Sequence, residues 1–204
     1  MIKFYKKIAV LLSALILLSF NIVTASNYTN SKTNNNSTTT PTNTANFYPY
    51  TIYNYDISIV VNENNTLQIT ENLGVYFNTP RHGIIRKIPI KNKVTRLDGS
   101  TSYNYSRISN INVAEKHTIS TENGNKIIKI GDEDQTLRGP KNYSISYLYD
   151  LGKDKIKNYD ELYFNLIGNE WDTTISNIDF TITMPKDFDK SKLGFSSRFI
   201  WIYR

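Results

Sequence analysis

The stretch LQITENLGVYF, residues 67–77, decides the fold because its apolar residues recur at almost every second position. One face of an extended chain would then carry Leu67, Ile69, Leu73, Val75 and Phe77. Such alternation is typical of a strand with one buried face. The same pattern occurs upstream at Ile57, Ile59 and Val61, and turn-forming residues 62–65 separate the two runs. The two runs therefore predict a β-hairpin.

Further strands follow along the chain. Residues 117–122 and 126–130 flank Asn123-Gly124, a pair that tolerates the positive φ of a tight hairpin turn. Residues 143–149 and 178–184 also alternate apolar and polar side chains. Helical periodicity is weak everywhere, and the best helical candidate is a short piece around 158–164. The sequence predicts an all-β fold, an antiparallel β-sandwich.

Glu71 interrupts the apolar face of the deciding stretch. A buried carboxylate needs a partner or a shifted pKa. We predict a partly buried ion pair with a basic residue from the following segment, Arg86. The alternative is that Glu71 lies at a strand end or bulge and reaches water.

Residues 1–25 have the composition of an export signal. Lys3, Lys6 and Lys7 precede the apolar run Ile8 to Phe20, and small residues end at Ala25. We expect cleavage and a mature chain that begins near Ser26 and is exported through the Sec pathway. An uncleaved anchor is the alternative, although the run is shorter than the roughly 20 residues of a bilayer span. The chain has no Cys, which excludes disulfides and a lipoprotein anchor.

The remaining chain divides into a spacer and one domain. Residues 26–46 are mostly Asn, Thr and Ser, a composition that predicts a disordered spacer, and residues 47–204 form the folded domain. Without the three lysines of the signal, 21 basic residues face 18 acidic ones, a net charge of +3. This excess is too small to indicate a nucleic acid partner.

Four motifs in order carry a family resemblance. They are HGIIRKIP at 82–89, IKIGD at 128–132, YSISY at 143–147 and FNLIGNEW at 164–171. Together with Thr70-Glu71 they resemble the DUF2207 family of predicted bacterial membrane proteins. The resemblance implies an extracytoplasmic β-rich domain behind a signal peptide, followed by further strands and a membrane anchor. It implies no catalytic residues.

The C-terminal end departs from that family pattern. After residues 194–197 the chain has only RFIWIYR, at 198–204, where the family continues into more strands and a membrane span. We therefore expect a C-terminally truncated domain that lacks its last strands and the membrane anchor of the family.

Catalytic templates are largely missing from the sequence. There is no Cys nucleophile, and the only two histidines, His82 and His117, are not placed beside a nucleophile by any motif. The enzymatic alternative is a carbohydrate-active enzyme that uses the acids near Trp171, namely Asp160, Glu161, Glu170 and Asp172. Residues 132–134, Asp-Glu-Asp, lack the glycine and terminal Glu of a calcium loop and predict a solvated turn.

The densest charge of the mature chain lies between residues 81 and 96. This stretch contains no Asp or Glu. Its basic residues, apart from Arg86, are Arg81, Lys87, Lys91, Lys93 and Arg96. These five predict a surface that binds an anionic envelope polymer or lipid headgroups. The alternative is a solvated loop with one internal partner for Glu71.

These observations favour a non-enzymatic binding or assembly module of the cell envelope. We expect no cofactor and no metal, and as partners an envelope polymer, lipid headgroups or another envelope protein. The alternatives are the carbohydrate-active enzyme and an inactive truncated gene product.

Overall fold

A computed structural model describes residues 7–13, 48–95, 99–153, 159–168 and 170–196 of the chain. Among these residues there are thirteen strands, one short 3-10 helix (η1, Lys190–Lys192) and no α-helix. In chain order the strands are β1 (Lys7–Ser13), β2 (Tyr50–Val61), β3 (Thr66–Arg81), β4 (Gly83–Pro89), β5 (Lys91–Thr95), β6 (Thr101–Tyr105), β7 (Arg107–Val113), β8 (His117–Glu122), β9 (Asn125–Gly131), β10 (Leu137–Asp150), β11 (Tyr159–Asn165), β12 (Ile178–Thr183) and β13 (Gly194–Ser196).

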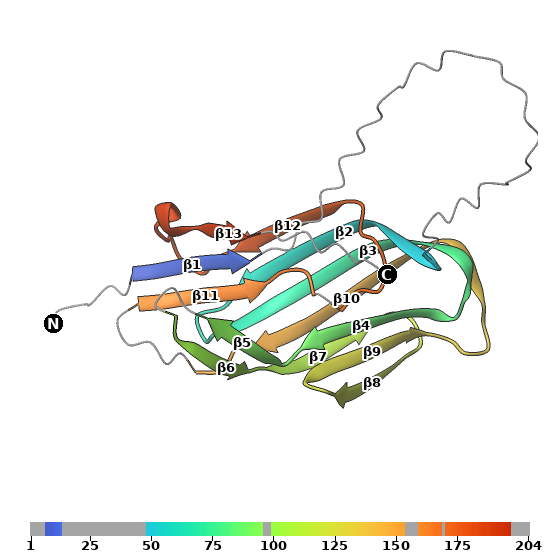
Figure 1. Ribbon diagram of the computed structural model, residues 1–204, viewed down its shortest axis with the longest axis horizontal. Coiled ribbons are helices and arrows are strands. Elements are labelled where there is room, and N and C mark those ends of the chain that lie inside the picture. Colours follow the sequence, from blue (N-terminus) through green and yellow to red (C-terminus); the bar gives the residue numbers. More distant parts are fainter. Residues whose placement is uncertain (1–6, 14–47, 96–98, 154–158, 169, 197–204) are drawn as a thin grey trace, which may run out of the picture.

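The largest sheet contains five strands in the order β12-β2-β3-β10-β7 (Figure 1). The predicted hairpin is its centre, since β2 pairs antiparallel with β3 and Ile59 lies opposite Ile69. β10 flanks β3 on the other side, also antiparallel. β12 joins the edge of β2 in parallel, so the sheet is mixed at that edge.

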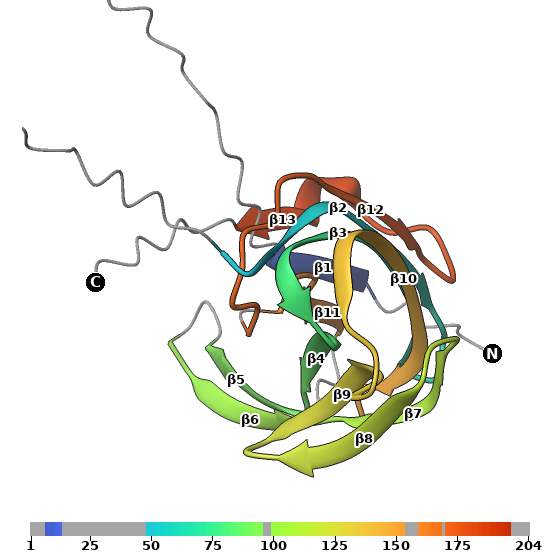
Figure 2. The same cartoon turned by 90° about the vertical axis from the view of Figure 1, so that its right-hand side faces the viewer.

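A second layer lies across the concave face of this sheet (Figure 2). It contains the antiparallel sheet β4-β9-β8 and the two-stranded sheet β5-β6. β8 and β9 form the hairpin predicted around Asn123-Gly124, and both turn residues have positive φ, 50° and 76°. That geometry suits the right-handed twist of the two strands.

The core forms between the two layers. Ile57, Ile69 and Ile145 of the five-stranded sheet belong to the same buried cluster as Ile84 and Ile128 of the second layer. All five side chains are at most 3% exposed. One continuous core between two sheet layers confirms the predicted all-β sandwich.

A β-bulge in β2 decides which tyrosines near its start are buried. The pairing with β3 shifts between Ile52 and Asn54, so Tyr50 and Tyr55 both point inward although they are an odd number of residues apart. Tyr53 is 43% exposed and covers Gly74, where an added Cβ would lie 2.5 Å from the tyrosine ring. A simple period-two pattern does not predict this change of face.

The helical candidate around 158–164 is wrong. Residues 159–165 form strand β11, in which Leu162 is buried and Phe164 half-buried. The segment contains two tyrosines and a phenylalanine, and aromatic residues favour strands. Its aromatic composition and its pairing with β1 therefore both favour the strand.

β11 belongs to a small parallel sheet in the order β11-β1-β13. β1 covers part of the apolar run that the sequence predicts as an export signal, and Lys7 to Ser13 pair with Tyr159 to Asn165. The predicted spacer, 26–46, and the terminal segment, 198–204, lie outside the described residues. Within the described part of the chain, no helix has the length and apolarity needed to span a bilayer.

Candidate functional site

The two buried charged side chains of the described residues form one ion pair between the two layers. Glu71 lies in the middle of β3, between Ile57 of β2 and Ile145 of β10, and is 1% exposed. Arg86 reaches it from β4 and is 4% exposed. Its Nε donates to Oε2 and its Nη2 to Oε1 of Glu71, each at 2.7 Å. The pair is therefore bidentate, the strongest geometry available to an arginine and a carboxylate.

Tyr147 completes the partners of the carboxylate. Its hydroxyl donates to Oε1 of Glu71 at 2.5 Å from β10, the strand next to β3. The side chain of Tyr55, from β2, is also fully buried beside this group. Side chains of β2, β3 and β10, three adjacent strands of the five-stranded sheet, thus surround the carboxylate within that layer.

Arg86 is enclosed by the segment that follows β11. Its Nη1 donates to the carbonyl oxygen of Lys87, and its guanidinium lies 5.4 Å from the centre of the Trp171 ring. An added Cβ on Gly168 would lie 2.7 Å from Nη1, so a larger residue there would displace the guanidinium from its present position. Tyr55 packs edge-on against the same Trp171 ring at 6.0 Å.

The surroundings fix the charges of this group. Burial alone would raise the pKa of the Glu71 carboxyl, but the Arg86 charge and the hydrogen bonds outweigh it, so this pKa lies below its ordinary value. Burial opposes the charge of Arg86, yet the adjacent carboxylate keeps the pKa of the guanidinium above its ordinary value. Burial also raises the pKa of Tyr147 and of Tyr55. At neutral pH Glu71 is therefore ionised and the two tyrosines are protonated.

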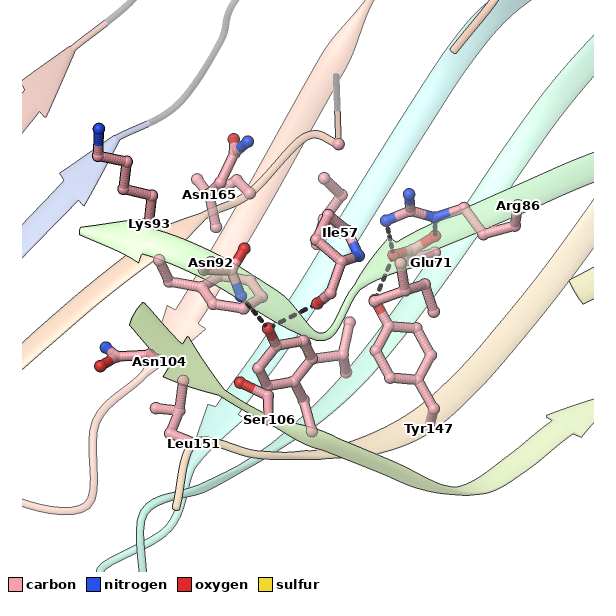
Figure 3. A pocket seen from close by; sticks show the side chains of 17 residues that line it. Ile57, Glu71, Arg86, Asn92, Lys93, Asn104, Ser106, Tyr147, Leu151 and Asn165 are labelled. Carbon is pink, nitrogen blue, oxygen red and sulfur yellow. Dashed lines mark hydrogen bonds and ion pairs between the residues drawn. The ribbon is translucent and has the colours of Figure 1, made fainter. Parts of the chain in front are cut away.

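A cavity of about 190 Å³ lies beside the ion pair (Figure 3). Asn92, Asn104 and Asn165 line its outer part, and Figure 3 shows the Glu71 carboxylate held between Arg86 and Tyr147 at the other side. The Tyr149 hydroxyl donates to the carbonyl oxygen of Pro89 and accepts a hydrogen bond from Asn92. The outer part of the cavity thus offers three amide side chains and the Lys93 ammonium, while the charges of Glu71 and Arg86 are paired with each other.

This arrangement is suited to holding the two layers together. Glu71 has no proton to give at neutral pH, and its oxygens already accept three hydrogen bonds. The ion pair links β3 to β4, and therefore one layer to the other. We interpret it as a structural element of the sandwich.

The five other basic residues of the 81–96 stretch do not share one element. Arg81 ends β3 and lies 5.2 Å from the centre of the Tyr50 ring. Lys87 of β4 lies 3.8 Å from a carboxylate oxygen of Glu170. Arg96 lies outside the described residues.

Lys91 and Lys93 lie together on β5, opposite two tyrosines of β6. In the register of this hairpin Lys91 pairs with Tyr105, and Lys93 with Tyr103. Directly paired residues of an antiparallel ladder point to the same face. The Lys91 Nζ lies 5.0 Å from the Tyr103 ring centre and 5.9 Å from that of Tyr105. The tyrosines are 52% and 67% exposed, so lysines and aromatic rings share one exposed face. We call these four residues the Lys/Tyr face.

Of the acids near Trp171, the two whose side chains the structure describes, Glu170 and Asp172, each interact with another side chain of the domain. Asp172 accepts a hydrogen bond of 2.5 Å from the Tyr50 hydroxyl, and Glu170 lies near Lys87. The side chains of Asp160 and Glu161 lie outside the described set. The Trp171 ring contacts Tyr55 and Arg86, as a core side chain does.

Residues 132–134 form a turn. Asp132 accepts hydrogen bonds from the Lys116 ammonium and from the backbone N–H of Asp134. Within the described ranges, no three His, Asp or Glu side chains come together as a metal ion would require.

Sequence reasoning did not find Tyr147, Gly168 and Trp171 as neighbours of the ion pair. For Tyr147 a signal was present, because the alternation of 143–149 places it on the apolar face, where its hydroxyl needs a polar partner. For Gly168 and Trp171 no local pattern identifies the contact, since it depends on how 164–171 crosses β4.

Comparison with family models gives one match. The model described as "Predicted membrane protein (DUF2207) N-terminal domain" matches residues 51–203. Comparison with curated proteins gives no match.

Similarity to solved structures is remote. An M1 zinc metallopeptidase from Deinococcus radiodurans matches at 12% identity and a TM-score of 0.31, over 50% of this chain and 20% of the peptidase. A two-domain M1 zinc metallopeptidase mutant bound to L-arginine matches at 14% identity and the same TM-score, over 53% and 22%. This chain thus spans about a fifth of the length of these peptidases, and a likeness at this level supports no conclusion about its activity.

Proposed function

Because the chain belongs to the DUF2207 family of predicted membrane proteins, we propose that its β-sandwich is a non-enzymatic binding module of the bacterial cell envelope. In this proposal the domain is exported and lies outside the cytoplasm, where the Lys/Tyr face contacts an anionic surface made of lipid headgroups or an envelope polymer. The observation that carries the proposal is the exposure of two lysines and two tyrosines on one face of the β5–β6 hairpin.

The chemistry of these side chains suits the interface between water and an anionic surface. A lysine near an anionic surface contributes on the order of 1 kcal/mol, and tyrosine combines an apolar ring with a polar tip. Lys91 and Lys93 extend from a short hairpin, so both can reach one flat partner. The buried ion pair supports the same proposal, since it fixes β4, from which the hairpin continues.

Binding to vesicles and to an envelope polymer tests the proposal. We expect the protein to bind vesicles that contain phosphatidylglycerol, or a teichoic-type polymer, at low salt, and to dissociate as salt is raised. Replacing Lys91 and Lys93 together by glutamine removes roughly 2 kcal/mol, which is about 30-fold in affinity. Replacing Tyr103 and Tyr105 by serine weakens binding further without changing the charge.

A charge-matched control separates the hairpin from the net charge. Arg138 and Lys186 are exposed on other strands or loops, and replacing both by glutamine removes the same total charge. This control should bind like the original protein. Binding that ignores salt, or an equal loss in both double variants, would rule out the Lys/Tyr face as the contact.

A further inference from the structure

A second concave site lies at the opposite end of β4 from the hairpin. It is a groove of about 650 Å³ between the end of β3, the start of β4 and the hairpin β8–β9. Its lining includes Ile85, whose apolar side chain is 42% exposed, and the buried residues Ile84 and Ile130. The length of β4 separates the groove from the Lys/Tyr face by about 20 Å. Both its volume and its partly apolar walls are typical of small-molecule sites.

Positive charge gathers along this groove. Arg81, Lys116 and Lys129 line it, against one acid, Glu133. Lys116 has a carboxylate partner at 2.8 Å, Asp132. Among the side chains that the structure describes, neither Arg81 nor Lys129 has a carboxylate within 4 Å. Two cations of the groove are therefore left for an anion brought by a ligand.

Both histidines of the chain also line the groove. His82 Nδ1 lies 3.0 Å from the carbonyl oxygen of Gln135, and His117 Nδ1 lies 2.8 Å from that of Glu115. A carbonyl oxygen only accepts, so each Nδ1 must carry the hydrogen. With Nδ1 as the donor, the lone pair of Nε2 is left to accept a hydrogen bond from a ligand hydroxyl.

Two glycines allow β4 and β9 to approach closely beside the histidines of the groove. Gly83 and Gly131 lie opposite each other in the β4–β9 pair, with φ of 149° and 146°. An added Cβ on Gly83 would lie 1.9 Å from the carbonyl oxygen of Ile130, and one on Gly131 equally close to that of His82. Only glycine permits this approach, which brings His82 next to Asp132. The backbone N–H of Asp132 donates to the carbonyl oxygen of His82 at 3.2 Å.

We propose that this groove binds a small ligand that carries a phosphate or carboxylate group on an apolar or ring-shaped body. Arg81 and Lys129 neutralise the oxyanion, the histidine Nε2 atoms hydrogen bond to the ligand, and the exposed side chain of Ile85 contacts its apolar part. The site is distinct from the Lys/Tyr face and does not depend on it.

Nuclear magnetic resonance of the two histidine rings provides the test, because the chain has no others. The probes are phenyl phosphate, inorganic phosphate and vesicles of phosphatidylglycerol in phosphatidylcholine, with sodium chloride at matched ionic strength as the reference. We expect phenyl phosphate to shift the signals of both rings, and to bind about tenfold more tightly than inorganic phosphate because its ring buries apolar surface. A response to vesicles alone would assign the oxyanion to a lipid headgroup, and a response to phenyl phosphate alone to a soluble ligand.

Matched variants complete the test. Arg81→Gln and Lys129→Gln should each weaken phenyl phosphate binding about tenfold, whereas Arg138→Gln, outside the groove, should leave it unchanged. Thermal melting shows whether each variant is folded, and Lys129 is exposed, so its replacement leaves the core intact. Histidine signals that respond to none of the three probes would overturn the proposal. So would equal binding by the Lys129→Gln variant and the unmodified protein.

Discussion

At the scale of single residues, Glu71 explains most about this domain. Its carboxylate lies in the middle of an otherwise apolar strand face, and Arg86 and Tyr147 donate three hydrogen bonds to it. Removing one charge of such a pair leaves the other buried and unpaired, which costs about 3–5 kcal/mol. Replacing both charges by apolar groups avoids that cost.

A double-mutant cycle tests this asymmetry. We expect Glu71→Ala to lower the free energy of unfolding by about 3–5 kcal/mol, and Glu71→Ala with Arg86→Met to lower it less. Urea denaturation measures both. The pair Arg107–Asp150 is the control, since its atoms lie at a similar distance, 2.8 Å against 2.7 Å, but Arg107 is 86% exposed. There Asp150→Ala should cost no more than about 1 kcal/mol. Additive losses for Glu71 and Arg86 would contradict a coupled pair.

The hydroxyl of Tyr147 has a separate effect that can be measured. Tyr147→Phe removes one hydrogen bond to an ionised group and should cost about 1.5–3 kcal/mol. Tyr76→Phe is the matched control because the Tyr76 side chain is 47% exposed. Thermal or urea melts compare the two variants. Equal stability in both would show that the Tyr147 hydroxyl contributes nothing to the ion pair.

The low pKa of Glu71 makes stability depend on acid pH. A carboxyl whose folded pKa lies below its unfolded value stabilises the fold above the unfolded pKa, and this contribution is lost as pH falls through the folded pKa. The ordinary value is 4.5, so the loss begins as pH falls through this region. Urea denaturation between pH 7 and pH 2 should show a smaller acid loss for Glu71→Ala with Arg86→Met than for the original chain. Parallel pH profiles would mean that Glu71 does not titrate in this way.

At the scale of secondary-structure elements, contacts between strands decide features that the apolar–polar alternation of a single segment does not predict. β11 forms a strand where weak periodicity favoured a helix, and the bulge in β2 buries Tyr55 as well as Tyr50. The close approach of β4 and β9 where Gly83 lies opposite Gly131 requires glycine on both strands. Each feature depends on a neighbouring strand rather than on the element's own sequence.

The facing glycines of β4 and β9, Gly83 and Gly131, give a prediction at this scale. Gly131→Ala combines a positive φ with a backbone clash at 1.9 Å and should destabilise the domain by more than the roughly 1–2 kcal/mol of the conformation alone. Gly139→Ala is the control, because Gly139 also has a positive φ, 81°, but nothing within 4 Å of its added Cβ. Melting temperatures compare the two. Equal shifts would show that β4 and β9 separate at little cost.

At the scale of the whole molecule, one core between two sheet layers accounts for stability in a chain without cysteine. The buried cluster of the described residues is drawn from Tyr50 onward. β1, by contrast, extends a small sheet with residues that the sequence assigns to an export signal. The same segment cannot be both cleaved and part of the mature fold.

Removing the first 25 residues distinguishes these possibilities. We expect the chain that begins at Ser26 to unfold cooperatively and with a β-rich circular-dichroism spectrum, because the core does not need β1. The chain that begins at Met1, expressed without export, serves as the control. Loss of the cooperative transition in the shorter chain would show that β1 is an integral strand and would argue against cleavage.

The sequence by itself determined the strand pattern, the sandwich and the need of Glu71 for a partner, because alternation is a local property of each strand. The basic residues of the 81–96 stretch were also identified there, whereas the two tyrosines that face Lys91 and Lys93 appear only in the structure. Only the tertiary structure decided that β12 joins β2 in parallel, that Tyr147, Gly168 and Trp171 surround the ion pair, and that the basic stretch divides between two ends of β4. These outcomes depend on which strands lie across from one another, and residues far apart in the chain meet only when both layers close over one core.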